Sequence, residues 1–364
     1  MEKNRSKGRN GEIDFLRFVF AMIIVVFHFN DIYSLGHFKA GAIGVEFFFL
    51  LSGVLMAKKA ESLYKSAACV PRSNNIPELT WSFLKAKVGT FYGYFIACAL
   101  INLIVRRIIL NGWSFLEICR AIIYDIPSFF MINMAGFSVY GGGVEATTWY
   151  LSVMILAFAI LFPILLYNYE WAAKIILPIF AIFALGYMYM TCGRIREIDR
   201  TVGIFRGGML RGLAEMSLGV LAWEISKKIK SIRFTAFSEW LLVLVKILSY
   251  AGIIVFGCSS LDKKNDIFAI LLCTCGIALS FSEVGKTLPD SALSRWLGKI
   301  SLPVYLIHVV VARISGTIFG YDVETHVIVF TLICSIVAAI VVMYATDAVM
   351  SWLKKHKNIF VRTE

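Results

Sequence analysis

Two ionisable residues, Arg17 and His28, lie within the first long apolar segment of the chain, residues 13–34. They are eleven positions apart. At about 100° per residue, this spacing makes three helical turns plus roughly 20°, so a helix would hold both side chains on one face, about 16 Å apart along its axis. An ionisable residue inside an apolar span indicates a functional site, and an imidazole there is suited to general-base chemistry. The alternatives are that Arg17 is a topology anchor and that His28 makes a hydrogen bond between helices.

Glu46 and His308 are two further candidates for chemistry inside apolar segments. Glu46 enters the second segment near the expected depth of His28, where a carboxylate would fix the imidazole tautomer and raise its basicity. His308 falls near the middle of the segment 298–318, where it could line the same cavity as His28. The alternatives are a Glu46 that faces interfacial water and a His308 that only packs against a neighbouring helix. Three small residues of the second segment predict close helix contacts, namely Gly44, Ser52 and Gly53.

These side chains need elements that hold them within a membrane, and the composition predicts such elements. Of the 364 residues, 59% are hydrophobic and 16% are charged, and the mean hydropathy is +0.76. A soluble domain has roughly 45–50% apolar residues and about 25% charged ones, so one core could not bury this apolar surface. A helix of about 20 apolar residues crosses a bilayer. We therefore predict an all-α fold, a polytopic membrane helix bundle that forms one domain over residues 1–364. About ten transmembrane helices are expected, at 13–34, 42–58, 85–105, 147–168, 171–190, 207–226, 238–258, 266–284, 298–318 and 326–353.

Charge sets the predicted orientation of these spans. If the segment 113–134 crossed the membrane, Lys227, Lys228 and Lys230 would fall outside, against the positive-inside rule. That segment also carries charges that are costly at the bilayer centre. We therefore expect 113–134 to be interfacial or re-entrant, and both termini to be cytoplasmic, with basic tails at 1–12 and 354–364.

The net charge of +12 and the eight cysteines indicate no nucleic-acid partner, no disulfide framework and no metal site. The basic residues lie mainly between apolar segments, where they set topology and attract anionic lipid or an anionic cofactor. Most cysteines fall in apolar segments, where a thiol acts as a small hydrophobic group. Cys273 and Cys275 lack the spacing of a metal site.

Four motifs, in this order along the chain, resemble those of a known family. They are Arg17-x10-His28, Gly44-Val-Glu-Phe-Phe-Phe-Leu-Leu-Ser-Gly53, Thr148-Trp149-Tyr150-Leu151 and Ser301-Leu-Pro-Val-Tyr305-Leu-Ile-His308. Together they resemble the acyltransferase 3 family of membrane O-acyltransferases over nearly the whole chain. The resemblance implies transfer of an acyl group, commonly acetyl from acetyl-CoA, to a sugar hydroxyl outside the cytoplasm. It also implies that Arg17 and His28 are essential.

With this resemblance, the residues predict a donor site and an acceptor site. The phosphates of cytoplasmic acyl-CoA would meet Arg17, Lys85 and Lys87. The acceptor would meet Trp149, Tyr150, Tyr305 and His308. His28 would be the general base, with Glu46 orienting it. A covalent intermediate on His28, Ser52 or Ser152 is a second possibility.

Two departures from the family pattern stand in this chain. Met154 occupies a position where many members have Glu, and Lys85 and Lys87 stand where members often carry an arginine-rich stretch. A lysine meets a phosphate as a point charge, without the paired geometry of arginine.

Two other function classes compete with the enzyme. A polysaccharide or lipid-linked sugar transporter would also place charges within its spans, but it predicts paired broken helices and symmetric halves. An assembly protein of a polysaccharide-synthesis complex predicts that Arg17 and His28 can be replaced with little effect. The enzyme is favoured, as a multi-pass protein of the plasma (inner) membrane with lipid, acyl-CoA and a carbohydrate as partners.

Overall fold

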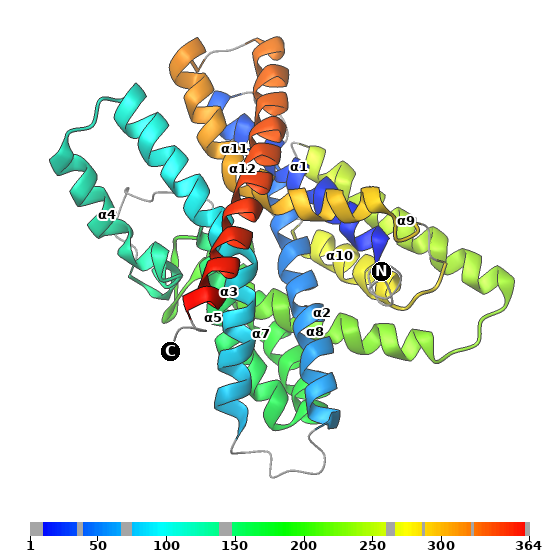
Figure 1. The fold of residues 1–364 in the computed structure, drawn as a ribbon. Helices are drawn as coiled ribbons and strands as arrows, with labels where there is room; N and C mark the ends of the chain where they lie inside the picture. Colours follow the sequence, from blue (N-terminus) through cyan, green and yellow to red (C-terminus); the bar gives the residue numbers. More distant parts are fainter. Residues whose placement is uncertain are drawn as a thin grey trace.

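The computed structural model describes residues 10–34, 39–66, 75–137, 148–259, 266–285, 288–321 and 324–360, which form an almost wholly helical fold (Figure 1). Its helices are α1 (Gly11–Tyr33), η1 (Gly41–Ile43), α2 (Gly44–Ser66), α3 (Ile76–Ile101), η3 (Asn102–Leu110), α4 (Phe115–Phe129), η4 (Asn133–Ala135), α5 (Thr148–Tyr167), α6 (Tyr169–Trp171), η5 (Ala172–Ile176), α7 (Leu177–Cys192), α8 (Gly207–Lys230), α9 (Ala236–Cys258), α10 (Asp266–Phe281), α11 (Ala292–Phe319) and α12 (Thr325–Phe360). Two short antiparallel strands, β1 (Thr201–Val202) and β2 (Phe205–Arg206), precede α8.

Seven helical segments of the described residues are long and apolar enough to cross a membrane. They are Gly41–Ser66, Ile76–Leu110, Thr148–Tyr167, Tyr169–Cys192, Ala236–Cys258, Ala292–Phe319 and Thr325–His356. Each of the ten predicted segments falls on a helix of the structure. The predicted class, an all-α membrane bundle, is confirmed; the count of ten spans and the cytoplasmic termini stay predictions. Helix α12 runs to Phe360, so the start of the predicted carboxyl-terminal tail is helical.

Helix α4 covers most of the segment 113–134 that we expect not to span. It has 15 residues, fewer than the about 20 that cross a bilayer. Ser114 caps it, and the Ser114 hydroxyl and N–H donate to the Glu117 carboxylate, which holds the pKa of Glu117 below its usual value. Apolar side chains such as Phe115 and Ile123 are exposed on it. An exposed apolar face on a short helix agrees with a place at the membrane interface.

Glycines let the central helices approach closely, as the small residues of the second segment predict. A Cβ added to Gly53 of α2 would lie 2.1 Å from the carbonyl oxygen of Met216 on α8. A Cβ added to Gly44 would lie 2.7 Å from Cγ1 of Ile24 on α1. The absence of a side chain at these two positions lets α2 pack directly against α8 and α1. The small-residue prediction is confirmed for these two glycines.

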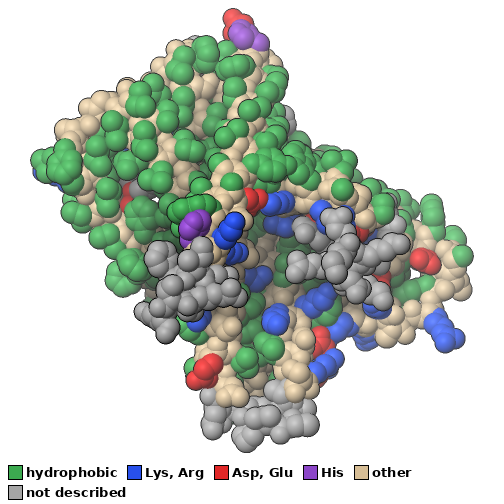
Figure 2. All heavy atoms as spheres, viewed as in Figure 1, with side chains coloured by type: hydrophobic (Ala, Val, Ile, Leu, Met, Phe, Trp, Pro, Cys, Tyr) green, Lys and Arg blue, Asp and Glu red, His purple; other side chains and the backbone are tan. Residues whose placement is uncertain are grey.

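Basic side chains gather on one half of the face drawn in Figure 2. Figure 2 shows Lys and Arg in the lower half of this face, beneath an upper part covered by hydrophobic side chains. In the same view the adjoining ends of α11 and α12 are at the top, and the adjoining ends of α2 and α3 are at the bottom (Figure 1). This asymmetry agrees with a cytoplasmic lower side under the positive-inside rule. The amino-terminal tail and the glycine run 141–143 lie outside the described residues.

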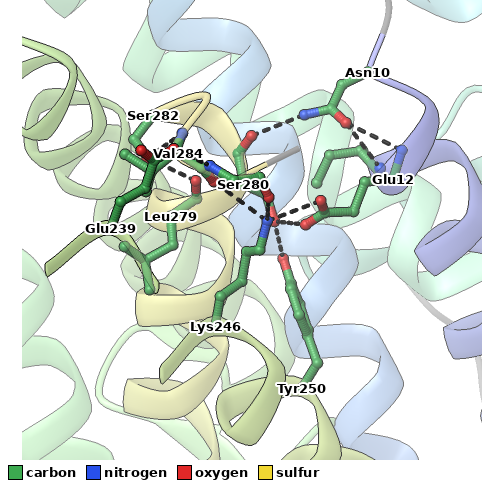
Figure 3. Close-up of polar contacts among 11 residues, drawn as sticks. Asn10, Glu12, Glu239, Lys246, Tyr250, Leu279, Ser280, Ser282 and Val284 are labelled. Carbon is green, nitrogen blue, oxygen red and sulfur yellow. Dashed lines mark hydrogen bonds and ion pairs between the residues drawn. The ribbon is translucent and has the colours of Figure 1, made fainter. Parts of the chain in front are cut away.

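A buried ion pair fixes the start of α1, the helix that carries Arg17 and His28. Lys246 points from α9 toward α1 and donates to the Glu12 carboxylate at 3.0 Å and to the Gly285 carbonyl at 2.8 Å (Figure 3). Ser280 of α10 donates to the same carboxylate, at 2.6 Å. Asn10 caps α1 and donates to the Ser280 carbonyl. These contacts join α1 to α9 and α10, and so fix the helix on which the candidate site is built.

Candidate functional site

A cavity of about 310 Å³ lies between α1, α2, α3, α5 and α11. We call it the central cavity. Arg17 and Ile24 line it from α1, one behind the other on the predicted helix face. Its other polar walls come from four helices and are Ser52, Lys87, Thr90, Tyr150, Ser301 and Tyr305. The motifs of the first, second, fourth and ninth predicted segments therefore meet at one place.

The basic end of the central cavity is formed by Arg17 and Lys87. Nη1 of Arg17 is 3.5 Å from the carboxylate of Asp14, and 32% of the Arg17 side chain is exposed. Nζ of Lys87 lies 5.5 Å from the ring centre of Phe83 and forms no ion pair within the described ranges. Two cationic side chains at one end of the cavity suit an anionic ligand.

Lys85 does not share this cavity with Lys87. It lies over Trp81, 5.7 Å from the ring centre, and lines a different groove on the other side of α3. Two residues along a helix are turned by about 200°, so the two side chains point to opposite faces. The predicted joint role of Lys85 and Lys87 therefore disagrees with their placement, and only Lys87 joins Arg17.

The two predicted histidines meet between α1 and α11. The ring centres of His28 and His308 are 5.2 Å apart, and His28 follows Ile24 of the cavity wall by one helical turn. Nδ1 of His308 is 3.1 Å from the Val304 carbonyl oxygen. A carbonyl only accepts, so Nδ1 carries the proton and Nε2 carries a lone pair. This buried Nε2 has no hydrogen-bond partner in the part of the chain that is described.

An unbroken series of rings connects the predicted acceptor residues to the histidines. The distance between ring centres is 6.5 Å from Trp149 to Tyr150, 5.9 Å from Tyr150 to Tyr305 and 6.1 Å from Tyr305 to His308. Trp149 and Tyr150 begin α5, and the other two residues lie on α11. The four residues predicted to bind the acceptor thus form one connected series, and its last member, His308, contacts His28.

Glu46 has a partner other than the predicted one. Its carboxylate is 2.6 Å from Nη2 of Arg211 on α8, and Arg211 also pairs with Glu215 at 2.9 Å. All three side chains are at most 1% exposed. The described residues show no hydrogen bond or ion pair between Glu46 and His28, so the predicted direct orientation of His28 by Glu46 lacks the contact it needs. The physical reason is that a buried carboxylate gains more from a guanidinium than from a neutral imidazole.

Arg211 and Glu215 belong to the site but were missed from the sequence. The guanidinium carbon of Arg211 lies 5.7 Å from the ring centre of Trp149. Arg211 thus contacts both Glu46 and the predicted acceptor residue Trp149. A signal was present, because Arg211 and Glu215 are charged residues four apart inside the predicted span 207–226.

The two serines considered as nucleophiles have different surroundings. Ser152 is fully buried, donates to the Met131 carbonyl at 2.9 Å and accepts from the Met134 N–H at 3.1 Å. Its hydroxyl thus holds the turn that follows α4. Ser52 lines the central cavity, where its Oγ is 3.3 Å from the hydroxyl of Tyr150 and 3.7 Å from the sulfur of Met154. Only Ser52 faces the space where a ligand would lie.

Metal-ligating residues do not cluster in the described part of the chain, where no three His, Cys, Asp or Glu side chains could hold one ion. The described cysteines are free thiols.

The fold and the site together define a multi-pass helical membrane protein whose cavity combines cations and hydroxyl groups, with an imidazole pair next to its wall at Tyr305. Sequence comparison then supplies the family. The family model described as "Acyltransferase domain" matches residues 10–345, nearly the whole chain. The chain belongs to this acyltransferase family, so the resemblance of the four motifs is confirmed. Among curated proteins and among solved structures, no match is found.

Proposed function

We propose that this protein moves an acyl group, most simply acetyl, from cytoplasmic acyl-CoA to a hydroxyl of a cell-surface polysaccharide or glycolipid outside the plasma membrane. One observation carries the proposal. A single cavity has two cations at one end, Arg17 and Lys87, and adjoins the His28–His308 pair at the other. An anionic donor and a base that acts on a hydroxyl group need these two ends, and membership of the acyltransferase family supports the reaction class.

The donor would lie along the central cavity. Arg17 and Lys87 would bind its phosphates from the cytoplasmic side, and the acyl-bearing arm would follow the wall formed by Ile24 and Tyr305 toward His28. A volume of about 310 Å³ suits the narrow arm, whereas the nucleotide would stay at the cytoplasmic mouth. Lys85 is left out of this donor site because it faces another groove.

The acceptor would approach from the outer side, against Trp149 and Tyr150, whose ring faces suit the apolar face of a sugar. His28 would take the proton of the acceptor hydroxyl while the oxygen attacks the thioester carbonyl. The tetrahedral intermediate would collapse with cleavage of the carbon–sulfur bond, and the departing CoA thiolate would take the proton that His28 holds. Hydroxyl groups of Ser52 and Tyr150 in the wall would stabilise the oxyanion.

His308 would act as a positioning residue in this scheme. Its Nδ1–H is directed to the Val304 carbonyl, so its Nε2 can only accept a hydrogen bond. An acceptor at this place would hold the protonated nitrogen of His28 and leave the other nitrogen free to act as the base. His308→Leu, which has no acceptor, would therefore lower kcat with little change in either KM.

The test compares surface glycans by mass spectrometry in a strain without this protein, complemented with the wild type, His28→Ala or His326→Ala. His326 is an exposed histidine of α12 and serves as the matched control. We expect one glycan to lose the mass of an acyl group in the deletion strain, and only the wild type and His326→Ala to restore it. Full acylation with His28→Ala, at equal protein levels in the membrane, would refute the proposed mechanism. Unchanged acylation with less exported glycan would instead support a transporter.

A further inference from the structure

A second and larger hollow, of about 880 Å³, lies on the opposite side of α3 from the central cavity. We call it the α3–α12 groove. Its walls come mainly from α3 and α12, with Phe129, Phe130 and Met131 at the end of α4 closing one side. Nearly all of its lining is apolar, and no lining residue is acidic. The proposed reaction uses none of the side chains of this groove.

Small residues of α3 form the groove. A Cβ added to Gly93 would lie 3.0 Å from Cγ2 of Thr346, so α3 and α12 touch at this level. A Cβ added to Gly89, one turn earlier, would meet no atom within 4 Å. The missing side chain at Gly89 therefore leaves open space in the wall of the groove.

The cytoplasmic end of the groove is basic. Lys85 lines it and lies over Trp81, which is 61% exposed, as interfacial tryptophans are. No carboxylate pairs with Lys85 in the described part of the chain. Lys354 follows directly after Leu353, a lining residue of α12, and is exposed. A cationic mouth on an apolar groove complements a molecule with an anionic head and a hydrocarbon chain.

We propose that the α3–α12 groove is a binding site for an anionic phospholipid of the cytoplasmic leaflet. The phosphate would be held at Lys85, and one acyl chain would lie along α3 over Gly89 and Gly93. The cytoplasmic leaflet is the source of this ligand because it carries the anionic lipids and because Lys85 is at the cytoplasmic end in the predicted orientation. The proposal stands independently of the acyl-transfer reaction.

The test is native mass spectrometry of the full chain in detergent, titrated with phosphatidylglycerol or with phosphatidylcholine of the same acyl chains. We expect the wild type to retain phosphatidylglycerol more tightly than phosphatidylcholine. Lys85→Gln should weaken the binding of phosphatidylglycerol about fivefold, as the removal of one basic residue near a membrane surface predicts. The binding of phosphatidylcholine should stay unchanged. Gly89→Leu should weaken both lipids, because the new side chain fills the groove.

Two variants are matched controls, Lys228→Gln for the charge and Gly186→Leu for the filled space. Lys228 is an exposed lysine at the end of α8, and a Cβ added to Gly186 of α7 likewise meets no atom within 4 Å. Both controls should retain phosphatidylglycerol as the wild type does. Equal retention of the two lipids by the wild type overturns the proposal, as does unchanged phosphatidylglycerol binding in Lys85→Gln. Displacement of the bound lipid by free CoA would assign Lys85 to the donor site instead.

Discussion

Replacing Glu46 by Gln removes one charge from a buried cluster while the side chain keeps its size. Arg211 pairs with Glu46 at 2.6 Å and with Glu215 at 2.9 Å, so in Glu46→Gln it still has one carboxylate. Glu46→Gln should therefore lower the free energy of unfolding by the contribution of one charge-assisted hydrogen bond, about 1.5–3 kcal/mol. Arg211→Met leaves two buried carboxylates without a cation and should cost more, about 3–5 kcal/mol.

The same substitution has a predicted effect on kinetics. In the wild type, the guanidinium carbon of Arg211 lies 5.7 Å from the ring centre of Trp149. With a neutral side chain at position 46, we expect this guanidinium to move toward Glu215 and away from Trp149. A desolvated cation–π contact is worth about 2 kcal/mol, so its loss should raise the KM for the acceptor by up to about 30-fold. The contact between His28 and His308 does not involve Glu46, so kcat should change by less than about threefold, under 1 kcal/mol.

Thermal unfolding and steady-state kinetics of the purified variants, with the acceptor concentration varied, measure both effects. Glu170→Gln is the matched control, because Glu170 forms an exposed pair with Lys174 and such pairs contribute about 0–1 kcal/mol. A kcat reduced more than about 100-fold at unchanged KM would refute this reasoning and show that Glu46 orients His28 directly. An Arg211→Met variant no less stable than Glu46→Gln would refute the structural part.

Two further substitutions test the placement of helix faces. Lys87→Met should raise the KM for acyl-CoA about tenfold, because it removes one charge-assisted contact of about 1.4 kcal/mol. Lys85→Met should leave this KM unchanged. Equal effects of the two substitutions would contradict the division of α3 into two faces. Gly53→Leu should prevent stable folding in the membrane, because its Cβ would lie 2.1 Å from the Met216 carbonyl oxygen. Gly186→Leu is the matched control, and size-exclusion profiles that are alike for both variants would argue against the close packing of α2 on α8.

The positions along single helices were predictable from the sequence. Arg17 and His28 were expected on one face of a helix, and in the structure Arg17 and Ile24 line the cavity with His28 one turn further on. The meeting of His28 with His308 was predictable as well, because both lie within apolar segments where a polar side chain needs a polar neighbour. Helical periodicity and the cost of an isolated polar group in lipid supply this information without any knowledge of the neighbouring helices.

The choice of partners among buried charges was not predictable. Glu46 has several polar groups within the same membrane depth, and only the packing of α2 on α8 through Gly53 brings Arg211 to it. Lys246 and Glu12 are separated by more than two hundred positions and pair because α9 lies against α1. Sequence spacing carries no information on such distant pairs, since helix neighbours are set by packing.

The sequence by itself determined the class of this protein: apolar segments long enough to cross a bilayer leave the chain few alternatives to a helical bundle, and four motifs in order identified the family. Only the tertiary structure decided that Lys87 faces the central cavity while Lys85 faces the α3–α12 groove, and that Arg211 contacts both Glu46 and Trp149. Membrane insertion depends on the hydropathy of each segment, which is local. The rotation of each helix and the identity of its neighbours depend on side-chain packing between segments distant in the chain.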